Sequence, residues 1–255
     1  LIRKRLDFLI CLGLILLLLA VRWLCMAHIT LDYTDFLSKW VDFFRLNGGF
    51  SALKYSIGNY NVPYLYLLAL ISYIPVSDLY LIKLVSIFFD FALAFAGQKI
   101  VSVFTGSRKK QLVCFFVILA LPTVILNGSY WGQCDAVYAA FALWSLYFAL
   151  RDHPILSVVM IALAFGFKLQ AVFIMPVFFI LLYRRKLKIR HLFVFPLTYV
   201  VLVLPAVLAG RPFLDTITLY FNQIDTVGNA LNYNSSSVFA LFTNIRNIKA
   251  AETAG

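Results

Sequence analysis

Charged side chains are scarce in this chain of 255 residues, where Asp, Glu, Lys and Arg together account for 13%. Soluble domains contain roughly 25% charged and roughly 45–50% apolar residues, whereas 63% of this sequence is hydrophobic. That balance excludes a soluble globular domain. It predicts an integral membrane protein with several apolar helices.

Acidic residues are scarcer still, with 11 Asp and Glu against 22 Lys and Arg and a formal net charge of +11. The basic residues are gathered in short segments between apolar runs. Such segments mark the cytoplasmic side of a membrane protein and attract anionic lipid headgroups. Membrane lipids are therefore expected partners, and the positive charge gives no reason to expect a nucleic acid.

Cysteine is also rare, with four residues and no C-x-x-C pair. Cys11, Cys25 and Cys114 lie in apolar runs, where cysteine behaves as a small hydrophobic residue. Neither a disulfide framework nor a zinc site is indicated. The chain likewise lacks an A-x-A cleavage site after its first apolar run, residues 8–27. We therefore interpret this run as a retained span and not as a signal peptide.

Long apolar runs are abundant, and they predict an all-α fold of the polytopic transmembrane type. With Arg3–Arg5 in the cytoplasm, most later basic segments fall on the same side if about seven runs cross the membrane. The run 62–75 has about 14 residues against the roughly 20 that a crossing needs, so we interpret it as a re-entrant or interfacial helix. The predicted spans are residues 7–27, 79–104, 111–127, 136–150, 154–168, 171–183 and 191–209.

Arg22, Lys83 and Asp90 are charged residues that lie inside these predicted spans. Arg22, near the outer end of the first span, is expected to snorkel to the membrane interface. Lys83 and Asp90 are seven residues apart on one face of the second span, and we interpret them as a buried polar link to another span.

The domain organisation follows from the spans, which predict one transmembrane module over residues 1–255. Its segment 28–63 is the one long stretch that is neither continuously apolar nor strongly basic, and we interpret it as the catalytic outer loop. Within that loop, aromatic residues recur at helical spacing over residues 36–44, which predicts an amphipathic helix lying on the membrane surface. Residues 213–255 are expected to form another outer loop, leading to spans beyond this sequence.

The predicted topology brings polar residues from distant parts of the chain to the outer side. Aromatic faces cover sugar rings, amides and carboxylates bind hydroxyls, and cations bind phosphate. A carboxylate can also take the proton of an attacking hydroxyl. Polar residues in apolar surroundings are costly and mark functional sites, so a sugar-binding pocket is predicted. Its candidates are Asp32, Asp35, Asn59, Tyr60, Asn61, Trp131, Gln133, Asp135, Lys168, Gln170 and Arg211.

Several of these candidates also have a purely structural explanation. Asp32 and Asp35 are both good carboxylates for the start of a helix. The same pair could hold a divalent metal ion, although no third ligand is evident in the sequence. Lys168 could snorkel from a short span. Trp131 to Asp135 could form a polar turn with an interfacial tryptophan.

Five segments resemble bacterial members of the GT-C glycosyltransferase superfamily, similar to the enzymes that depend on dolichyl-phosphate mannose or glucose. The resemblance covers about residues 1–245, and the segments are LDYTDFLSKW, NGGFSAL, GNYNVPYLYLLAL, SYWGQCDAVYAAF and FGFKLQAVFIMP. It implies an inverting transferase in the cell membrane that uses a polyisoprenyl-phosphate monosaccharide at a site on the extracytoplasmic face.

Two motifs of the resemblance bear on the site residues. A catalytic Asp in a Gly-Asp-Tyr setting follows the first span in that superfamily. Asp32-Tyr33 corresponds to it here, with Leu31 in place of the glycine, which leaves Asp35 open as the alternative. The superfamily's Asn-Tyr-x-Pro-Pro-Tyr appears as 59–64, with Val62 in place of the first proline, and it adds Tyr64 to the sugar-binding candidates.

Together these observations predict a hexosyltransferase in which Asp32 acts as the base while Lys168 and Arg211 hold the donor phosphate. The remaining candidates contact the sugar or a glycan or lipid-linked acceptor, and no cofactor is expected. The alternative is a transporter or flippase of lipid-linked sugars, with Lys83, Asp90 and Lys168 along its path. Inverted repeats would favour it, and the sequence shows none. An inactive assembly subunit is a third interpretation.

Overall fold

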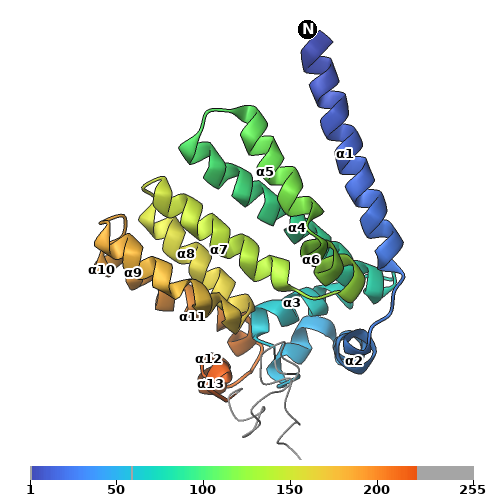
Figure 1. The fold of residues 1–255 in the computed structure, drawn as a ribbon. Helices are drawn as coiled ribbons and strands as arrows, with labels where there is room; N and C mark the ends of the chain where they lie inside the picture. Colours follow the sequence, from blue (N-terminus) through green and yellow to red (C-terminus); the bar gives the residue numbers. More distant parts are fainter. Residues whose placement is uncertain (1, 59, 223–255) are drawn as a thin grey trace, which may run out of the picture. The chain divides into compact units, whose positions relative to one another are not determined.

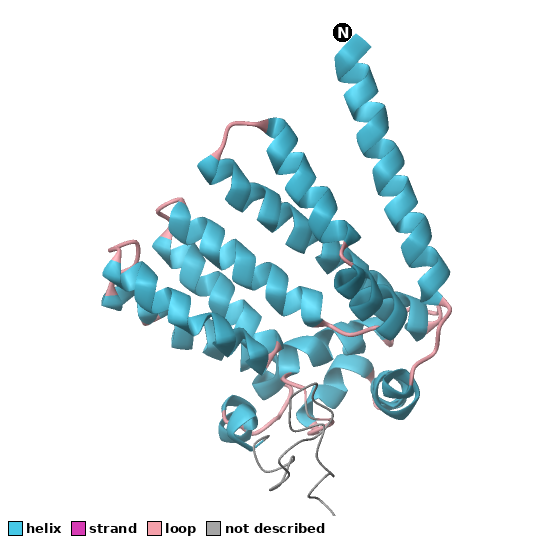
Figure 2. Cartoon of the chain, in the orientation of Figure 1, coloured by secondary structure: helices cyan, strands magenta, loops and turns pink. Residues whose placement is uncertain are grey.

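A computed structural model describes residues 2–58 and 60–222, and their regular secondary structure is helical (Figures 1 and 2). No strand occurs in these ranges, which confirms the all-α prediction for them. The chain divides into two compact units, Leu1–Thr216 and Ile217–Gly255. The first unit carries the elements discussed below. Most of the predicted outer loop 213–255 lies outside the described residues.

Three helical segments in the described ranges are long and apolar enough to cross a membrane. They are Arg5–Met26 within α1 (Ile2–Met26), α4 (Asp78–Phe104), and Ile189–Leu208, which combines α10 (Ile189–Leu192) and α11 (Val194–Leu208). A fourth candidate is broken, because α5 (Arg108–Ala120) and the segment Pro122–Trp131 meet at 50°. Pro122 explains the break, since it lacks an N–H and forces Leu121 out of the helical conformation.

Three other predicted spans are apolar but contain only 10 to 17 residues each, below the roughly 20 of a full crossing. They are α7 (Asp135–Leu150), α8 (Pro154–Phe167) and the segment Leu169–Tyr183, formed by η4 (Leu169–Ile174) and α9 (Met175–Tyr183). Helix length and composition therefore give three or four candidate spans among the described residues, and the predicted seven stay a prediction.

The helices of the first unit pack side by side, with α7 against α8, α4 against α5 and α7, and α11 against α8. The consecutive pairs α4–α5 and α7–α8 are antiparallel (Figure 1). Small residues allow the close approach, as they do between membrane helices generally. The hydroxyl of Ser145 on α7 donates to the carbonyl of Ser157 on α8 at 2.7 Å, and both residues are fully buried. At Gly97 on α4, a Cβ atom would lie 2.2 Å from the side chain of Ile118 on α5.

The two ends of the helical bundle differ in charge. The α4–α5, α7–α8 and α9–α10 connections lie on the side of Figure 1 that also holds the N-terminus. They contain the basic segments Arg108–Lys110, Arg151 and Arg184–Arg190. The C-terminal ends of α1, α8 and α11 lie at the other end, with the N-terminal ends of α4 and α7 (Figure 1). We call the first the basic end and the second the polar end.

Arg22 does not reach the membrane interface as predicted, because its side chain is fully buried. Its Nε donates to Asp90 Oδ2 at 3.0 Å, and its Nη2 donates to the carbonyl of Leu119 at 2.8 Å. One guanidinium therefore joins α1, α4 and α5. The carboxylate and the carbonyl replace the water that snorkelling would have supplied.

Lys83 confirms the predicted buried link between spans. Its ammonium donates to the carbonyls of His28 at 2.6 Å, Tyr130 at 2.9 Å and Met26 at 3.1 Å. The orphan carbonyls at the C-terminal end of α1 carry partial negative charge, so they suit a buried cation. Asp90 forms the same kind of link through Arg22.

The Arg22–Asp90 pair provides a stability prediction. We expect Asp90→Ala to lower the free energy of unfolding by roughly 3–5 kcal/mol, because it leaves Arg22 buried without its carboxylate. The double variant R22M/D90L replaces both charges by apolar side chains and should recover most of that loss. Thermal unfolding in detergent measures both. Equal destabilisation by the single and double variants would contradict the pairing.

The segment predicted to be an outer loop folds into short helices at the polar end (Figure 1). They are η1 (Tyr33–Leu37), α2 (Ser38–Leu46), η2 (Gly49–Lys54) and α3 (Val62–Ile71). The apolar side chains Trp40, Val41 and Phe44 of α2 are buried, and α2 packs against α3, η2 and α4. That face is therefore covered by protein, in contrast to the predicted membrane-surface helix. Gly58, at φ +63°, is required because a Cβ atom there would meet the Trp40 ring at 2.4 Å.

Candidate active site

Asp32 follows α1 at the polar end and contacts a segment about 100 residues further along the chain. Its Oδ2 accepts from Trp131 Nε1 at 2.6 Å and from Gln133 Nε2 at 2.7 Å. The carboxylate stands at the N-cap position of η1 but makes no capping hydrogen bond. The helix-cap explanation is therefore wrong for the Asp32 side chain, which instead holds the turn between η3 (Leu126–Trp131) and α7.

Gln133 connects Asp32 to a second polar group. While its Nε2 donates to Asp32, its Oε1 accepts from the Tyr60 hydroxyl at 3.2 Å. Burial raises the pKa of Tyr60, so the phenol stays protonated and keeps its donor. Gly132 reverses the chain just before Gln133 with a left-handed φ of +80°, and the Thr30 hydroxyl donates to the Trp131 carbonyl at 3.2 Å.

A cavity of about 180 Å³ opens beside this network. Its volume lies below the roughly 300–1,000 Å³ of most ligand pockets, so it suits one small group and not a lipid chain. Aromatic rings form much of the wall, with Tyr60 in edge contact with Trp40 at 5.6 Å and close to Tyr64 at 4.8 Å between centroids. The lining residues are Asp32, Phe36, Leu37, Trp40, Tyr60, Tyr64, Gly132 and Gln133.

Lys168 forms the second centre of charge at the polar end. It follows α8, and its ammonium makes an ion pair with Asp135 in the first turn of α7. Asp135 Oδ2 also accepts from Asn127 Nδ2 at 2.8 Å. Burial disfavours the Lys168 ammonium, but Cys134 and Asp135 outweigh it and its pKa is raised. Residues 133–135 thus connect the Asp32 cavity to the lysine.

Arg211 lies at the same end, beyond the C-terminus of α11. It is 3% exposed, and its Nη2 donates to Ser56 Oγ at 3.2 Å and its Nη1 to the Tyr55 carbonyl at 3.4 Å. Its Nε has no partner within the described part of the chain. Burial lowers its pKa, although an arginine remains a cation at neutral pH. Its described hydrogen bonds fix the loop that leads to Tyr60 and do not reach Lys168.

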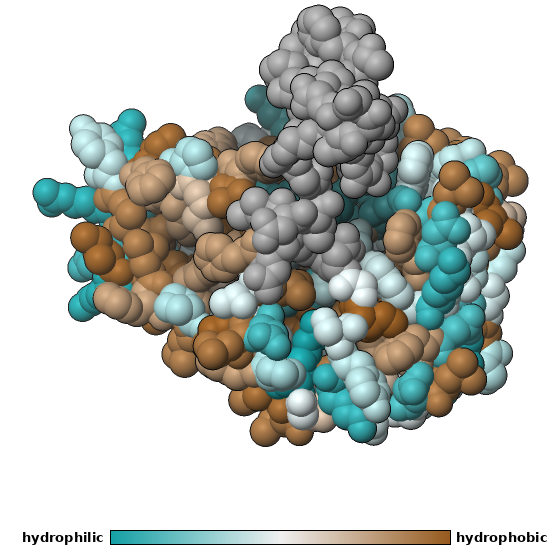
Figure 3. All heavy atoms as spheres, turned by 90° about the horizontal axis from the view of Figure 1, so that it is seen from below, coloured by the Kyte–Doolittle hydropathy of each residue, from teal (hydrophilic) through white to brown (hydrophobic). Residues whose placement is uncertain are grey.

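The polar end is therefore a mixed surface, and Figure 3 shows this face with hydrophilic and hydrophobic residues side by side. A carboxylate and an amide stand at an aromatic cavity, with two cations on flanking loops. The model of glycosyltransferase family 87 matches residues 59–254. The chain belongs to this family. Family 87 consists of GT-C-type membrane glycosyltransferases.

This family-87 protein is thus a membrane glycosyltransferase, with a sugar donor and an acceptor. No curated protein and no solved structure matches the chain. The matched range begins at residue 59, so it contains Trp131, Gln133, Lys168 and Arg211 but neither Asp32 nor Asp35. Support for Asp32 comes from its contacts and its place at the cavity.

Three other predicted site residues of the family-87 chain, Asp35, Asn61 and Gln170, do not line the Asp32 cavity. Asp35 and Gln170 are exposed. Asn61 is 1% exposed, and its predicted sugar contact stays a prediction. Its Oδ1 accepts from the Val62 N–H at 2.8 Å as the cap of α3, and its Nδ2 donates to Tyr199 at 3.0 Å. Asn59 lies outside the described residues.

Trp40 and Asn127 contribute to the site but are not among the site residues predicted from the sequence. Trp40 was placed on the membrane-facing side of an amphipathic helix, because helical spacing reveals an apolar face but not what covers it. Asn127 stands eight residues before Asp135 and holds its second oxygen. Its position between an apolar run and the Trp131–Asp135 turn is the feature of the sequence that could have indicated a role in the site.

Proposed function

We propose that this family-87 protein is an inverting hexosyltransferase. It moves one sugar from a polyisoprenyl-phosphate carrier to an acceptor hydroxyl on the extracytoplasmic side of the cell membrane. The observation that carries the proposal is the Asp32 carboxylate, oriented by Trp131 and Gln133 at the edge of a cavity sized for a small group. A glycan or a lipid-linked glycan supplies the acceptor hydroxyl.

The proposed side of the membrane follows from the two ends of the bundle. Seven antiparallel passes, with α5 to η3 counted as one and α3 not crossing, put all the basic connections on one side. The positive-inside rule assigns that side to the cytoplasm, so the polar end with Asp32 faces outward. With ten residues, α3 is shorter than α7, α8 and the segment Leu169–Tyr183, which supports leaving it out of the count of passes.

Asp32 has the geometry of a general base in this proposal. Trp131 and Gln133 both donate to Oδ2, and Oδ1 makes no hydrogen bond within the described ranges. Oδ1 accepts the proton of the acceptor hydroxyl as that oxygen attacks the anomeric carbon. The bond from this carbon to the phosphate oxygen breaks on the opposite face, and its electron pair leaves with the phosphate, so the configuration inverts.

Lys168 and Arg211 are the proposed ligands of the departing phosphate. Negative charge grows on the phosphate oxygen as the sugar leaves, and a nearby cation stabilises that charge in the transition state. Lys168 is already paired with Asp135, so a bound donor phosphate would share the Lys168 ammonium with the Asp135 carboxylate. Arg211 has a buried Nε that makes no hydrogen bond to any residue the structure describes. The aromatic rings of Trp40, Tyr60 and Tyr64 provide the apolar faces for the sugar.

The donor class is tested with purified protein in proteoliposomes. We expect a polyprenyl-phosphate sugar to be consumed, with release of polyprenyl phosphate, when a glycolipid extract of the source membrane supplies acceptors. A nucleoside-diphosphate sugar should not be consumed. Consumption of the nucleotide sugar alone would contradict the proposed donor. Movement of the lipid-linked sugar across the bilayer without cleavage would instead support the flippase interpretation.

A further inference from the structure

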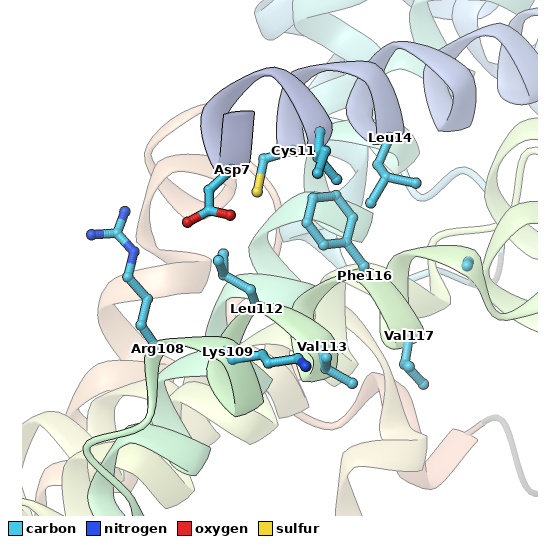
Figure 4. Close-up of a pocket in the computed structure, with 11 residues that line it drawn as sticks. Asp7, Cys11, Leu14, Arg108, Lys109, Leu112, Val113, Phe116 and Val117 are labelled. Atoms are coloured by element: carbon cyan, nitrogen blue, oxygen red, sulfur yellow. The ribbon is translucent and has the colours of Figure 1, made fainter. Parts of the chain in front are cut away.

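A second feature of the molecule lies at the basic end, away from Asp32. A cavity of about 650 Å³ separates the first half of α1 from α5 (Figure 4). We call it the α1–α5 groove. Its walls are apolar and include Cys11 and Leu14 on α1 and Leu112, Val113 and Phe116 on α5.

The mouth of the α1–α5 groove carries charges of both signs. Asp7 projects from α1, and Arg108 and Lys109 come from the first turn of α5. Figure 4 shows the Asp7 carboxylate and the Arg108 guanidinium at the same end of the groove, with the Lys109 side chain directed along α5. None of the three belongs to an ion pair within the described residues. These charges are available to a ligand.

The length of the groove matches one leaflet of a membrane. The α5 residues that line it run from Arg108 to Ala120, which corresponds to about 18 Å of helix. Half of the hydrocarbon core of a bilayer is about 15 Å thick. An acyl chain whose headgroup lies at Arg108 would therefore follow the groove to its apolar end, near the break at Leu121.

We propose that the α1–α5 groove binds one phospholipid with an amine-bearing headgroup. Arg108 and Lys109 bind the phosphate, Asp7 binds the ammonium, and an acyl chain lies against Leu112 and Phe116. A headgroup with a phosphate and no amine would use Arg108 and Lys109 but leave the Asp7 carboxylate without a counterion, next to a second negative charge. Phosphatidylethanolamine has both groups in the required order along the molecule.

Other occupants of the α1–α5 groove fit less well. Membrane helices associate closely through small residues, whereas the groove presents Leu14, Leu112 and Phe116. A polyisoprenyl phosphate lacks the amine that would pair with Asp7. Its proposed reaction site is also at the opposite end of the bundle. The lipid bound here is thus a structural partner, distinct from the sugar donor.

The test is competitive lipid binding to the purified protein, read by native mass spectrometry. Delipidated protein receives equal amounts of phosphatidylethanolamine, phosphatidylglycerol and phosphatidylcholine. We expect one phosphatidylethanolamine per chain, enriched roughly fivefold over phosphatidylglycerol, about the factor that one charge contact at a membrane surface supplies. Equal binding of the three lipids, or preference for phosphatidylglycerol, would overturn the proposal.

Four variants locate the lipid. R108Q/K109Q should reduce bound phospholipid at least roughly tenfold, whereas D7N should keep the lipid and lose the preference over phosphatidylglycerol. Lys110→Gln is the matched control, because Lys110 lies on the same turn and does not line the groove. Val117→Trp fills the apolar part with the charged mouth intact, and it should also lose the lipid.

Two further outcomes would contradict the proposal. If R108Q/K109Q and Val117→Trp bind as much phosphatidylethanolamine as the wild type, the lipid lies elsewhere. If a polyprenyl phosphate displaces phosphatidylethanolamine, or a dimer without lipid replaces the lipid-bound monomer, the groove has a different occupant. The release of polyprenyl phosphate from a sugar donor is measured separately, so failure here leaves the proposed enzyme activity untouched.

Discussion

Asp32→Asn is expected to reduce sugar transfer by about 10²–10⁴-fold, the usual contribution of a general base. Asparagine retains an oxygen that can accept from Trp131 and Gln133, so the turn at the cavity should stay in place. What it lacks is the ability to take the acceptor proton. The loss should therefore appear in kcat, with little change in KM for the donor. Initial rates of transfer from a polyprenyl-phosphate sugar measure it.

Asp35→Asn is the matched control for this experiment. Asp35 lies three residues further along, within the short helix η1 that Asp32 precedes, but it is exposed and does not line the cavity. We expect its activity to stay within about twofold of the wild type, since surface substitutions away from a site usually have small effects. Near-normal transfer by folded Asp32→Asn would exclude Asp32 as the base. A selective loss in Asp35→Asn would move the role to that residue.

Lys168→Met is expected to lower kcat/KM for the donor by about 10²–10³-fold, by analogy with the removal of one transition-state donor. Methionine keeps much of the apolar length of the lysine side chain and removes only the cation. Without it, the negative charge that grows on the departing phosphate has Arg211 as its remaining proposed partner. The measurement is donor turnover at several donor concentrations, which separates kcat from KM.

Asp135→Asn distinguishes phosphate binding from a structural role of Lys168. That substitution breaks the ion pair but leaves the ammonium in place, so a catalytic cation should still function. If Lys168→Met loses activity and Asp135→Asn keeps most of it, the cation acts on the donor. Equal losses in the two variants, with recovery in the double variant K168M/D135N, would instead assign the pair a purely structural role.

The helices were predictable where the sequence alone determines them. The predicted spans 136–150 and 154–168 differ from α7 and α8 by one residue at one end, because Asp135, Asp152 and Pro154 punctuate continuous apolar sequence. The predicted span 111–127 missed the break at Pro122. A proline inside an apolar run indicates a kink or the end of a helix. The length of the run alone does not reveal that break.

For the candidate site, the sequence predicts which residues lie on one side of the membrane but not which of them are in contact. From the sequence, Asp32, Trp131 and Gln133 are predicted to share one side of the membrane, but the hydrogen bonds that join them across about 100 residues are not predictable from it. Asn61 was expected at the sugar because polar residues beside apolar runs mark functional sites. Its side chain instead caps α3 and donates to Tyr199, 138 residues away. Such partners depend on tertiary packing.

Arg22 is another residue whose partner depends on tertiary packing, so the sequence predicts it at the membrane interface. Nothing near it in the sequence can neutralise a buried guanidinium, since its carboxylate partner is 68 residues away. Snorkelling is the local solution for an arginine near the end of a span. The fold has a non-local solution, which requires α4 and α5 to be in place.

The distance in sequence between Arg22 and Asp90 has a consequence for biogenesis. The ribosome completes α1 well before α4, so the newly made first helix meets the insertion machinery with its guanidinium still lacking a counterion. An arginine in an apolar helix opposes insertion by roughly 2.5–3.5 kcal/mol at the bilayer centre. Until α4 is made, snorkelling to the interface is therefore the solution open to Arg22, and its guanidinium takes up the buried position only once Asp90 is in place.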